Sequence, residues 1–153
     1  MNIIFLDIDG VITSARTGWM NWDIYAVTFL KWICEKANIQ IVISSSWRHN
    51  HNKQFFVDIF GNIIHKDWKI PTFISAIRGK EIQQWLDNHP EVQTYLIIDD
   101  DSDMLPDQPL LLTSTYDGLS FDNQNFIRDY FDCNEPCNMN LQNIVQHSNM
   151  FAK

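Results

Sequence analysis

The chain starts with an apolar run at residues 2–6 that leads directly into Asp7, Asp9 and Gly10. A run of this length predicts a buried strand. In an extended chain, residues two positions apart point to the same side, so the side chains of Asp7 and Asp9 lie together. Two such carboxylates repel each other unless a cation lies between them. These residues therefore require a fold in which a buried strand ends at a polar site. They suggest an aspartate nucleophile, a second aspartate that handles protons and a divalent metal.

Strand and helix patterns alternate along the rest of the chain. Apolar runs predict three further strands, at residues 39–43, 94–98 and 110–113, while residues 62–66 are compatible with a fifth. Four helices are predicted: one capped by Asp23, one near 55–60 closed by Gly61, one near 82–89 that ends at Pro90, and one capped by Asp122 or Asn123. This alternation indicates an α/β fold, a Rossmann-like three-layer sandwich with a mainly parallel sheet.

Three of the predicted strands end in polar side chains. These are Asp7 and Asp9 after the first strand, Ser44 and Ser45 after the second, and Asp99 and Asp100 after the strand that ends at Ile98. In open parallel sheets, ligands bind at the carboxyl ends of the strands. Adjacent carboxylates behind a buried strand repel one another, and a metal ion relieves that repulsion. The three strand ends therefore predict one shared site.

The distribution of charge argues against a generally basic nucleic-acid-binding surface. The 153 residues carry a formal net charge of −8. Residues 48–80 are the exception, because six Lys and Arg against two Asp make this segment +4 and leave −12 for the rest. Aromatic residues accompany the basic segment, among them Trp47 and Trp68. Cationic and aromatic side chains together are the pairing that binds single-stranded nucleic acid.

The length predicts one domain with a sizeable core, at residues 1–131, followed by a polar extension at 132–153. No stretch is long and apolar enough to predict a membrane span, so we expect no membrane partner. Three cysteines, an odd number, and the lack of a signal-peptide pattern are typical of a reducing compartment. We therefore expect a cytoplasmic protein, and the sequence leaves its oligomeric state open.

The order of these motifs resembles the haloacid dehalogenase (HAD) superfamily of phosphohydrolases. The shared pattern is Asp-x-Asp-Gly-Val, a strand followed by serine, a basic residue at a helix start and a strand followed by Asp-Asp. Four segments resemble more narrowly the HAD domains of Swiss Army Knife RNA-repair proteins: Ile-Ser-Ser-Ser-Trp-Arg at 43–48, Arg-Gly-Lys-Glu-Ile-Gln-Gln-Trp-Leu at 78–86, Ile-Ile-Asp-Asp-Asp-Ser-Asp-Met at 97–104 and Gly-Leu-Ser at 118–120. The resemblance covers residues 1–131 and implies a HAD fold.

The resemblance implies a Mg²⁺-dependent phosphatase that works through an aspartyl-phosphate. Asp7 would attack the phosphorus, and Asp9 would protonate the leaving oxygen and then activate water. Ser44, with Ser45 as its alternative, would bind a phosphoryl oxygen. Asp100 would bind Mg²⁺ together with the carboxylate of Asp7 and the backbone carbonyl of Asp9. An aspartate at position 9 separates phosphatases from the dehalogenases and P-type ATPases of the superfamily.

The remaining roles are also carried over from the resemblance. Arg78 would orient Asp7 and the phosphate, with Lys80 as the rival because most of the superfamily has lysine at this place. Asp99 stands where many members have glycine and would act in support of the metal site, as would Asp103. The sequence does not decide whether Arg78 or Lys80 is the essential basic residue.

The spacing of the motifs predicts a capless or minimally capped enzyme. The gap between Asp9 and the helix behind Asp23 is too short for a folded cap, and a helix and a short strand occupy the gap between Ser44 and Arg78. An open site suits a macromolecular end better than a small metabolite, which gains from closure. We therefore expect removal of a terminal phosphate, with the 3′ end favoured, from RNA or DNA, and the resemblance implies a role in nucleic-acid repair.

Gly10, Trp47 and Arg48 are the candidate substrate-binding residues, with Trp47 and Arg48 expected at the surface. Two alternatives stay open. One is a small-molecule or protein phosphatase of the same superfamily. The other is a non-catalytic phospho-acceptor or Mg²⁺-binding module like a response-regulator receiver, although receivers carry their acidic, phospho-acceptor and basic residues in a different order.

Overall fold

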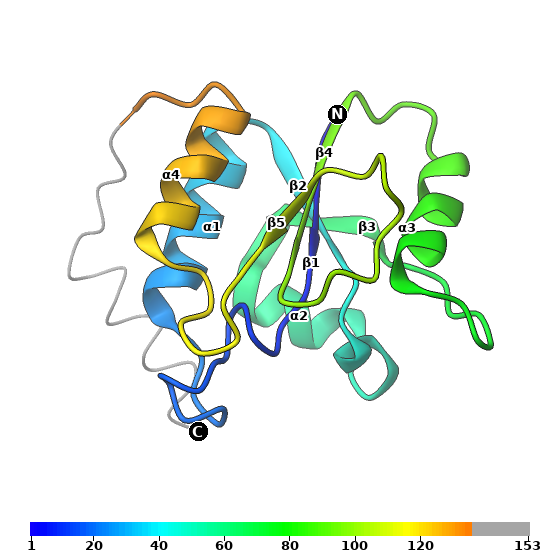
Figure 1. Cartoon of the computed structure of the whole chain (residues 1–153). Helices are drawn as coiled ribbons and strands as arrows, with labels where there is room; N and C mark the ends of the chain where they lie inside the picture. The colour runs from blue at the N-terminus through cyan, green and yellow to red at the C-terminus, as the bar shows by residue number, and fades with distance from the viewer. Residues whose placement is uncertain (136–153) are drawn as a thin grey trace.

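The computed structural model describes residues 1–135, which fold around one parallel sheet (Figure 1). Its five strands are β1 (Asn2–Leu6), β2 (Ile39–Ile43), β3 (Ile64–Lys69), β4 (Thr94–Asp99) and β5 (Leu110–Leu112). Their order across the sheet is β3-β2-β1-β4-β5, and every neighbouring pair is parallel. The predicted parallel α/β sheet is confirmed, and the strand that the sequence left open forms the edge strand β3.

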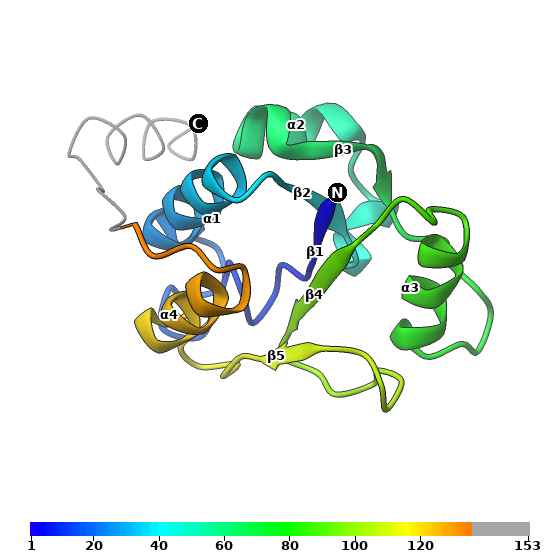
Figure 2. The same ribbon diagram turned by 90° about the horizontal axis from the view of Figure 1, so that it is seen from above.

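Helices cover both faces of this sheet (Figure 2). They are α1 (Ile24–Lys36), α2 (Lys53–Phe60), α3 (Arg78–Asp87) and α4 (Phe121–Tyr130), with the short 3-10 turns η1 (Ser46–His49) and η2 (Gly61–Ile63). Alternate residues of β1 face opposite layers. Ile4 and Leu6 join the core with α1, α2 and α4, whereas Ile3 and Phe5 join the core with α3. The predicted three-layer sandwich is therefore confirmed.

The predicted start of α1 is confirmed, but the predicted start of α4 is wrong. Asp23 caps α1 by accepting two backbone N–H groups of its first turn. At α4 the cap is Ser120, whose hydroxyl accepts the N–H of Asn123 at 3.1 Å while the Asn123 side chain accepts the N–H of Ser120 at 3.1 Å. This reciprocal capping box places Asp122 and Asn123 inside the first turn.

The segment between β2 and α3 builds part of the main domain. Phe56 and Phe60 of α2 are buried in the larger core, and β3 pairs with β2. These elements complete the sheet and its helical cover, so the prediction of a capless or minimally capped fold is confirmed for residues 1–135. Among the described helices, none has both the length and the apolar character needed to cross a bilayer. The extension predicted for residues 132–153 lies mostly outside the described residues and stays a prediction.

Candidate active site

The register of the sheet brings three predicted site residues to one level. Leu6, the last residue of β1, pairs with Ile43 of β2 and with Ile98 of β4. The residues that follow are Asp7, Ser44 and Asp99, which therefore meet at the carboxyl edge of the sheet. Backbone bonds fix this arrangement, because the N–H of Asp7 donates to the oxygen of Ile98 and the N–H of Ser44 donates to the oxygen of Leu6, both at 3.0 Å.

Three carboxylates form an acidic cluster at this edge. One oxygen each of Asp7, Asp99 and Asp100 lies within 4.8 Å of the other two. Asp7 and Asp99 are buried, and Asp100 is half-buried. A donor set made only of carboxylate oxygens fits a hard cation such as Mg²⁺. Asp99 was expected only in support of the metal site, but it lies in the same cluster as Asp100.

Burial shifts the protonation of this cluster. Desolvation, reinforced by the charge of Asp99, raises the pKa of Asp7 from 3.8 to about 8. Desolvation is also the main cause that raises the pKa of Asp99 to about 6. The positive charge of Arg78 lowers the pKa of both groups without offsetting their burial. Because only an ionised Asp7 can act as a nucleophile, the site needs a further positive charge, which a divalent cation would supply.

Arg78 is the basic residue that the structure brings to the acidic cluster. Its Nη1 lies 4.0 Å from Oδ1 of Asp7 and 3.8 Å from Oδ2 of Asp99. The same nitrogen donates a hydrogen bond to the backbone oxygen of Ser44. Lys80 is exposed on α3, since residues two positions apart on a helix face different directions. The geometry therefore favours Arg78 over Lys80 as the residue that orients Asp7.

A loop behind β4 determines where Arg78 stands. The N-cap residue of α3, Ile77, has no side chain that can cap, and Oδ2 of Asp103 accepts the N–H of Arg78 at 3.2 Å instead. The backbone oxygen of Asp103 accepts the N–H of Gly79 at 3.0 Å. A side chain at Gly79 would collide with the backbone at Leu105. Asp103 and Gly79 therefore hold the first turn of α3, and with it Arg78, against the loop.

The prediction that the Arg48 side chain lies at the surface is wrong, and substrate binding by Arg48 stays a prediction. Its side chain is 3% exposed, and its Nη2 lies 3.3 Å from Oε1 of Glu81. Its Nη1 donates to the backbone oxygens of Ser44 and Ser45 at 2.8 and 3.0 Å. A buried cation is tolerated only when it is paired and hydrogen-bonded. Glu81 provides that pairing and also lies 3.8 Å from Nε of Arg78, so it connects the two arginines.

The two candidate serines have different surroundings. Ser45 caps η1, because its hydroxyl accepts the N–H of Trp47 at 3.2 Å. Ser44 is fully buried, and its hydroxyl has no hydrogen-bond partner within the described residues. A buried polar group without a partner is costly, and a phosphoryl oxygen would satisfy it. The geometry therefore favours Ser44 as the phosphate-binding serine.

Both carboxylate oxygens of Asp9 accept hydrogen bonds. Oδ1 accepts the hydroxyl of Thr13 at 2.8 Å, and Oδ2 accepts the indole N–H of Trp47 at 3.0 Å. The Trp47 ring stacks on His51 at 5.1 Å between centroids and meets Trp22 edge-on at 5.5 Å. These aromatic neighbours hold Trp47, which in turn orients Asp9. Contact between Trp47 and a substrate stays a prediction.

Gly10 lies against Asp100 of the acidic cluster. Its φ is +82°, and a Cβ at this position would collide with the Asp100 carboxylate. Thr115 donates its hydroxyl to Oδ2 of Asp100 at 3.0 Å, and Thr113 donates its hydroxyl to the backbone oxygen of Gly10 at 2.7 Å. Glycine is thus required at position 10 for Asp100 to approach Asp7. Substrate binding by Gly10 stays a prediction.

Sequence reasoning missed three residues that hold the site together. Glu81 had a detectable signal, because it lies three positions after Arg78, a spacing at which helical side chains interact. Thr13 and Thr115 had none, since both lie in loops whose course depends on tertiary contacts. The positions of Asp9 and Asp100 therefore depend on two threonines that no motif identified.

A sequence model of one protein family, described as "HAD domain in Swiss Army Knife RNA repair proteins", matches residues 3–123. This range includes the acidic cluster, Ser44, Arg78 and every other candidate site residue. Searches of curated proteins and of solved structures found no match. The family match agrees with the resemblance seen in the motifs.

Proposed function

Because the chain belongs to the family of HAD domains found in Swiss Army Knife RNA-repair proteins, we propose that it is a Mg²⁺-dependent phosphatase that removes a terminal phosphate from a polynucleotide. The observation that carries the proposal is the meeting of the acidic cluster with Arg78 at one sheet edge. A carboxylate nucleophile can approach a phosphate dianion only where positive charge offsets their repulsion. Arg78 and a cation in the cluster together meet that requirement.

The proposed reaction forms and then hydrolyses an aspartyl-phosphate. An oxygen of Asp7 attacks the phosphorus while the bond to the leaving oxygen breaks, and protonated Asp9 donates its proton to that oxygen. Arg78 and the free hydroxyl of Ser44 bind phosphoryl oxygens. Asp9 then takes a proton from the water that attacks the phosphorus, while the bond between the phosphorus and the Asp7 oxygen breaks, which releases phosphate and restores the Asp7 carboxylate. Asp7, Asp99 and Asp100 would hold Mg²⁺, which would supply positive charge to neutralise the phosphoryl oxygens.

Three observations support a polynucleotide end as the substrate, with a 3′-phosphate favoured. The family description names RNA repair. The described elements between Ser44 and Arg78 belong to the main domain rather than to a cap. Exposed Lys69 pairs with Ile43 at the carboxyl end of β3, the sheet edge that carries Ser44. Lys69, which also lies over the ring of Trp68, therefore replaces Arg48 as the cation expected to face a nucleic-acid backbone.

A phosphatase screen of the wild type and Asp7→Asn, with and without Mg²⁺, tests this proposal. The substrates are 3′- and 5′-phosphorylated RNA and DNA oligonucleotides, nucleotides, sugar phosphates and a phosphopeptide. We expect Mg²⁺-dependent and salt-sensitive release of phosphate from oligonucleotide ends, and a loss of at least about 1,000-fold in Asp7→Asn. Turnover of the small substrates or the phosphopeptide alone would contradict the polynucleotide substrate. Absence of hydrolysis with every substrate would favour the non-catalytic module.

A further inference from the structure

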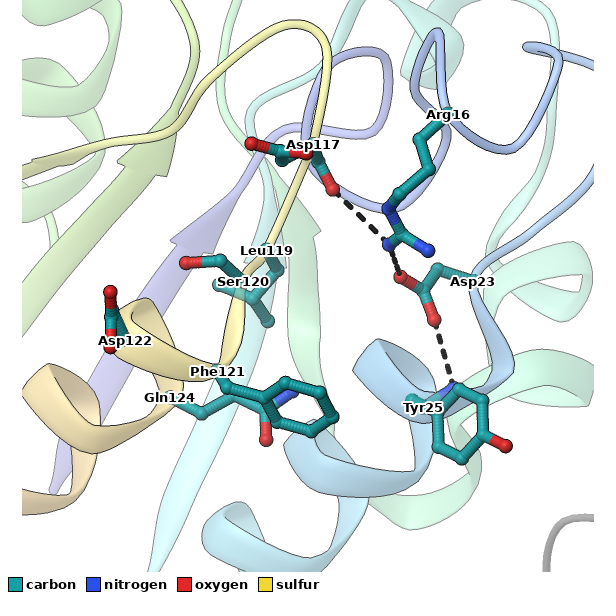
Figure 3. A pocket seen from close by; sticks show the side chains of 9 residues that line it. All are labelled: Arg16, Asp23, Tyr25, Asp117, Leu119, Ser120, Phe121, Asp122 and Gln124. Carbon is teal, nitrogen blue, oxygen red and sulfur yellow. Dashed lines mark hydrogen bonds and ion pairs between the residues drawn. The ribbon is translucent and has the colours of Figure 1, made fainter.

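A cavity lies between the N-terminal ends of α1 and α4. Its volume is about 710 Å³, within the range of small-molecule sites. It is lined by Arg16, Asp23, Tyr25, Asp117, Leu119, Ser120, Phe121, Asp122 and Gln124 (Figure 3). None of these residues has a role in the phosphatase chemistry described above. We call this cavity the α1/α4 pocket.

Two aromatic rings from different helices line the α1/α4 pocket. Tyr25 of α1 and Phe121 of α4 both line the pocket, and the Phe121 ring is directed towards α1 (Figure 3). Their exposed fractions are 47% and 70%, which is unusual for aromatic side chains of this size. Exposed rings at the mouth of a cavity provide stacking surfaces for a flat, apolar ring system.

A buried amide also lines the α1/α4 pocket. Gln124 of α4 is 7% exposed. An amide offers both a donor and an acceptor, which is the pattern presented by the edge of a nucleobase. Gln124 therefore adds a polar group to the aromatic lining of the pocket, which suits a ligand with polar ring edges.

The charges around the α1/α4 pocket disfavour the binding of a phosphate group there. Arg16 is already paired with Asp23 at 2.6 Å and donates to the backbone oxygen of Asp117 at 3.2 Å. The side chains of Asp117 and Asp122 add two carboxylates at the exposed rim. A second phosphate would be repelled there, whereas the amino and imino N–H groups of a neutral base can donate to carboxylates.

A single loop joins the α1/α4 pocket to the acidic cluster. Thr115 contacts Asp100 at 3.0 Å, and Asp117 of the pocket lies two residues further along. Two residues span at most about 7 Å. The loop behind β1 runs alongside, since the N–H of Ala15 donates to the oxygen of Thr115. A phosphate at Asp7 and a ring attached to the same sugar can therefore occupy neighbouring sites.

We propose that the α1/α4 pocket binds the base of the terminal nucleotide whose phosphate is removed at Asp7. This inference rests on the proposed function and names the part of the substrate next to the reacting phosphate. Phe121 and Tyr25 stack on the base, and Gln124 hydrogen-bonds its edge. The pocket thereby distinguishes a nucleotide end from any other phosphate monoester.

Two oligonucleotides that carry a 3′-phosphate test the proposal, one with a normal terminal nucleotide and one with an abasic terminal sugar. We expect the wild type to show a KM about tenfold lower for the base-bearing oligonucleotide. Phe121→Ala and Gln124→Met should remove that difference. Phe126→Ala is the matched control, because Phe126 is an exposed aromatic residue of α4 that does not line the pocket, and it should keep the difference. Thermal melts establish that each variant is folded.

A binding measurement distinguishes a failure of this proposal from a failure of the proposed function. Fluorescence anisotropy of the same oligonucleotides on Asp7→Asn with Mg²⁺ measures base recognition without turnover. Equal hydrolysis and equal binding of the two oligonucleotides would contradict base binding by the pocket. The same result would still support the proposed phosphatase activity. Base-dependent binding that Phe121→Ala abolishes supports the pocket even if the wild type hydrolyses neither oligonucleotide, which would overturn the proposed function alone.

Discussion

The two sides of the acidic cluster differ in how far their side chains are buried. On the α3 side, Arg48, Arg78 and Glu81 form a largely buried network in which the charges pair with one another. On the α1/α4 side, Tyr25 and Phe121 are exposed around an open pocket. The first side is built to hold the catalytic groups in place, and the second has surface left for a ligand.

This difference teaches that the net charge of a segment does not predict the charge of a surface. Residues 48–80 carry +4, but Glu81, just outside that segment, draws Arg48 into the interior. Because a buried arginine is stable only beside a carboxylate, the position of one acid decides which cations face solvent. We therefore expect variants on the α3 side to lose activity or stability. Variants of the exposed pocket residues Tyr25 and Phe121 should keep their activity on simple phosphate esters.

The largest effect is expected for Arg78→Ala. Loss of the charge beside Asp7 removes stabilisation of the transferring phosphoryl group, so kcat should fall by about 100-fold to 1,000-fold. Lys80→Ala is the matched control on the same helix and should keep activity within about twofold. Steady-state kinetics on a generic aryl phosphate measures both. Equal losses in the two variants would contradict the assignment of Arg78.

The second largest effect is expected for Glu81→Gln. Removing the carboxylate leaves Arg48 buried without its counter-charge, which costs on the order of 3 kcal/mol of unfolding free energy. Asp87→Asn, at an exposed position of α3, should change it by less than about 0.5 kcal/mol. Urea unfolding compares the two variants. If Glu81→Gln is as stable as the wild type, the buried network does not hold the α3 side together.

A smaller effect is expected for Trp47→Phe, in the 3-10 turn η1. The variant keeps an aromatic ring but loses the N–H that donates to Asp9. Asp9 is then less well oriented, so it should protonate the leaving oxygen more slowly. We expect kcat to fall about tenfold for alkyl phosphates and to change little for aryl phosphates with good leaving groups. Trp32→Phe on α1 is the control. A uniform loss across leaving groups would indicate a packing role only.

The smallest effect concerns the acidic cluster in metal-free protein. Because the pKa of Asp7 is raised to about 8, the folded state binds more protons than the unfolded state between about pH 4 and pH 8. The contribution of Asp7 to stability is therefore lost as the pH rises through this range. In chelator at pH 8, Asp7→Asn should melt about 3 °C above the wild type, or about 1 kcal/mol.

The same melting experiments compare two pH values and compare protein with and without Mg²⁺. The advantage of Asp7→Asn should shrink at pH 5, and Mg²⁺ should stabilise the wild type at pH 8 more than it stabilises the variant. Asp101→Asn, at an exposed neighbouring position, should melt with the wild type at both pH values. An Asp7→Asn variant that melts below the wild type at pH 8 in chelator would mean that Asp7 is not destabilised by burial.

Much of the fold and part of the candidate site could be predicted from local patterns. The strand ends were predictable because apolar runs stop abruptly at Asp7, Ser44 and Asp99, and parallel pairing brings such ends together. The cap of α4 was not, because Ser120, Asp122 and Asn123 can all cap a helix and only the observed hydrogen bonds distinguish them.

The sequence by itself determined the parallel sheet, the residues at its carboxyl edge and the family, because hydrophobic periodicity and motif order are local properties of the chain. The tertiary structure decided that Arg48 faces inward, that Arg78 rather than Lys80 reaches Asp7, and that Trp47 holds Asp9. Each of these depends on a partner far away in the sequence. The free energy of a buried charge or a buried hydrogen bond is set by such partners, and they are known only once the chain is folded.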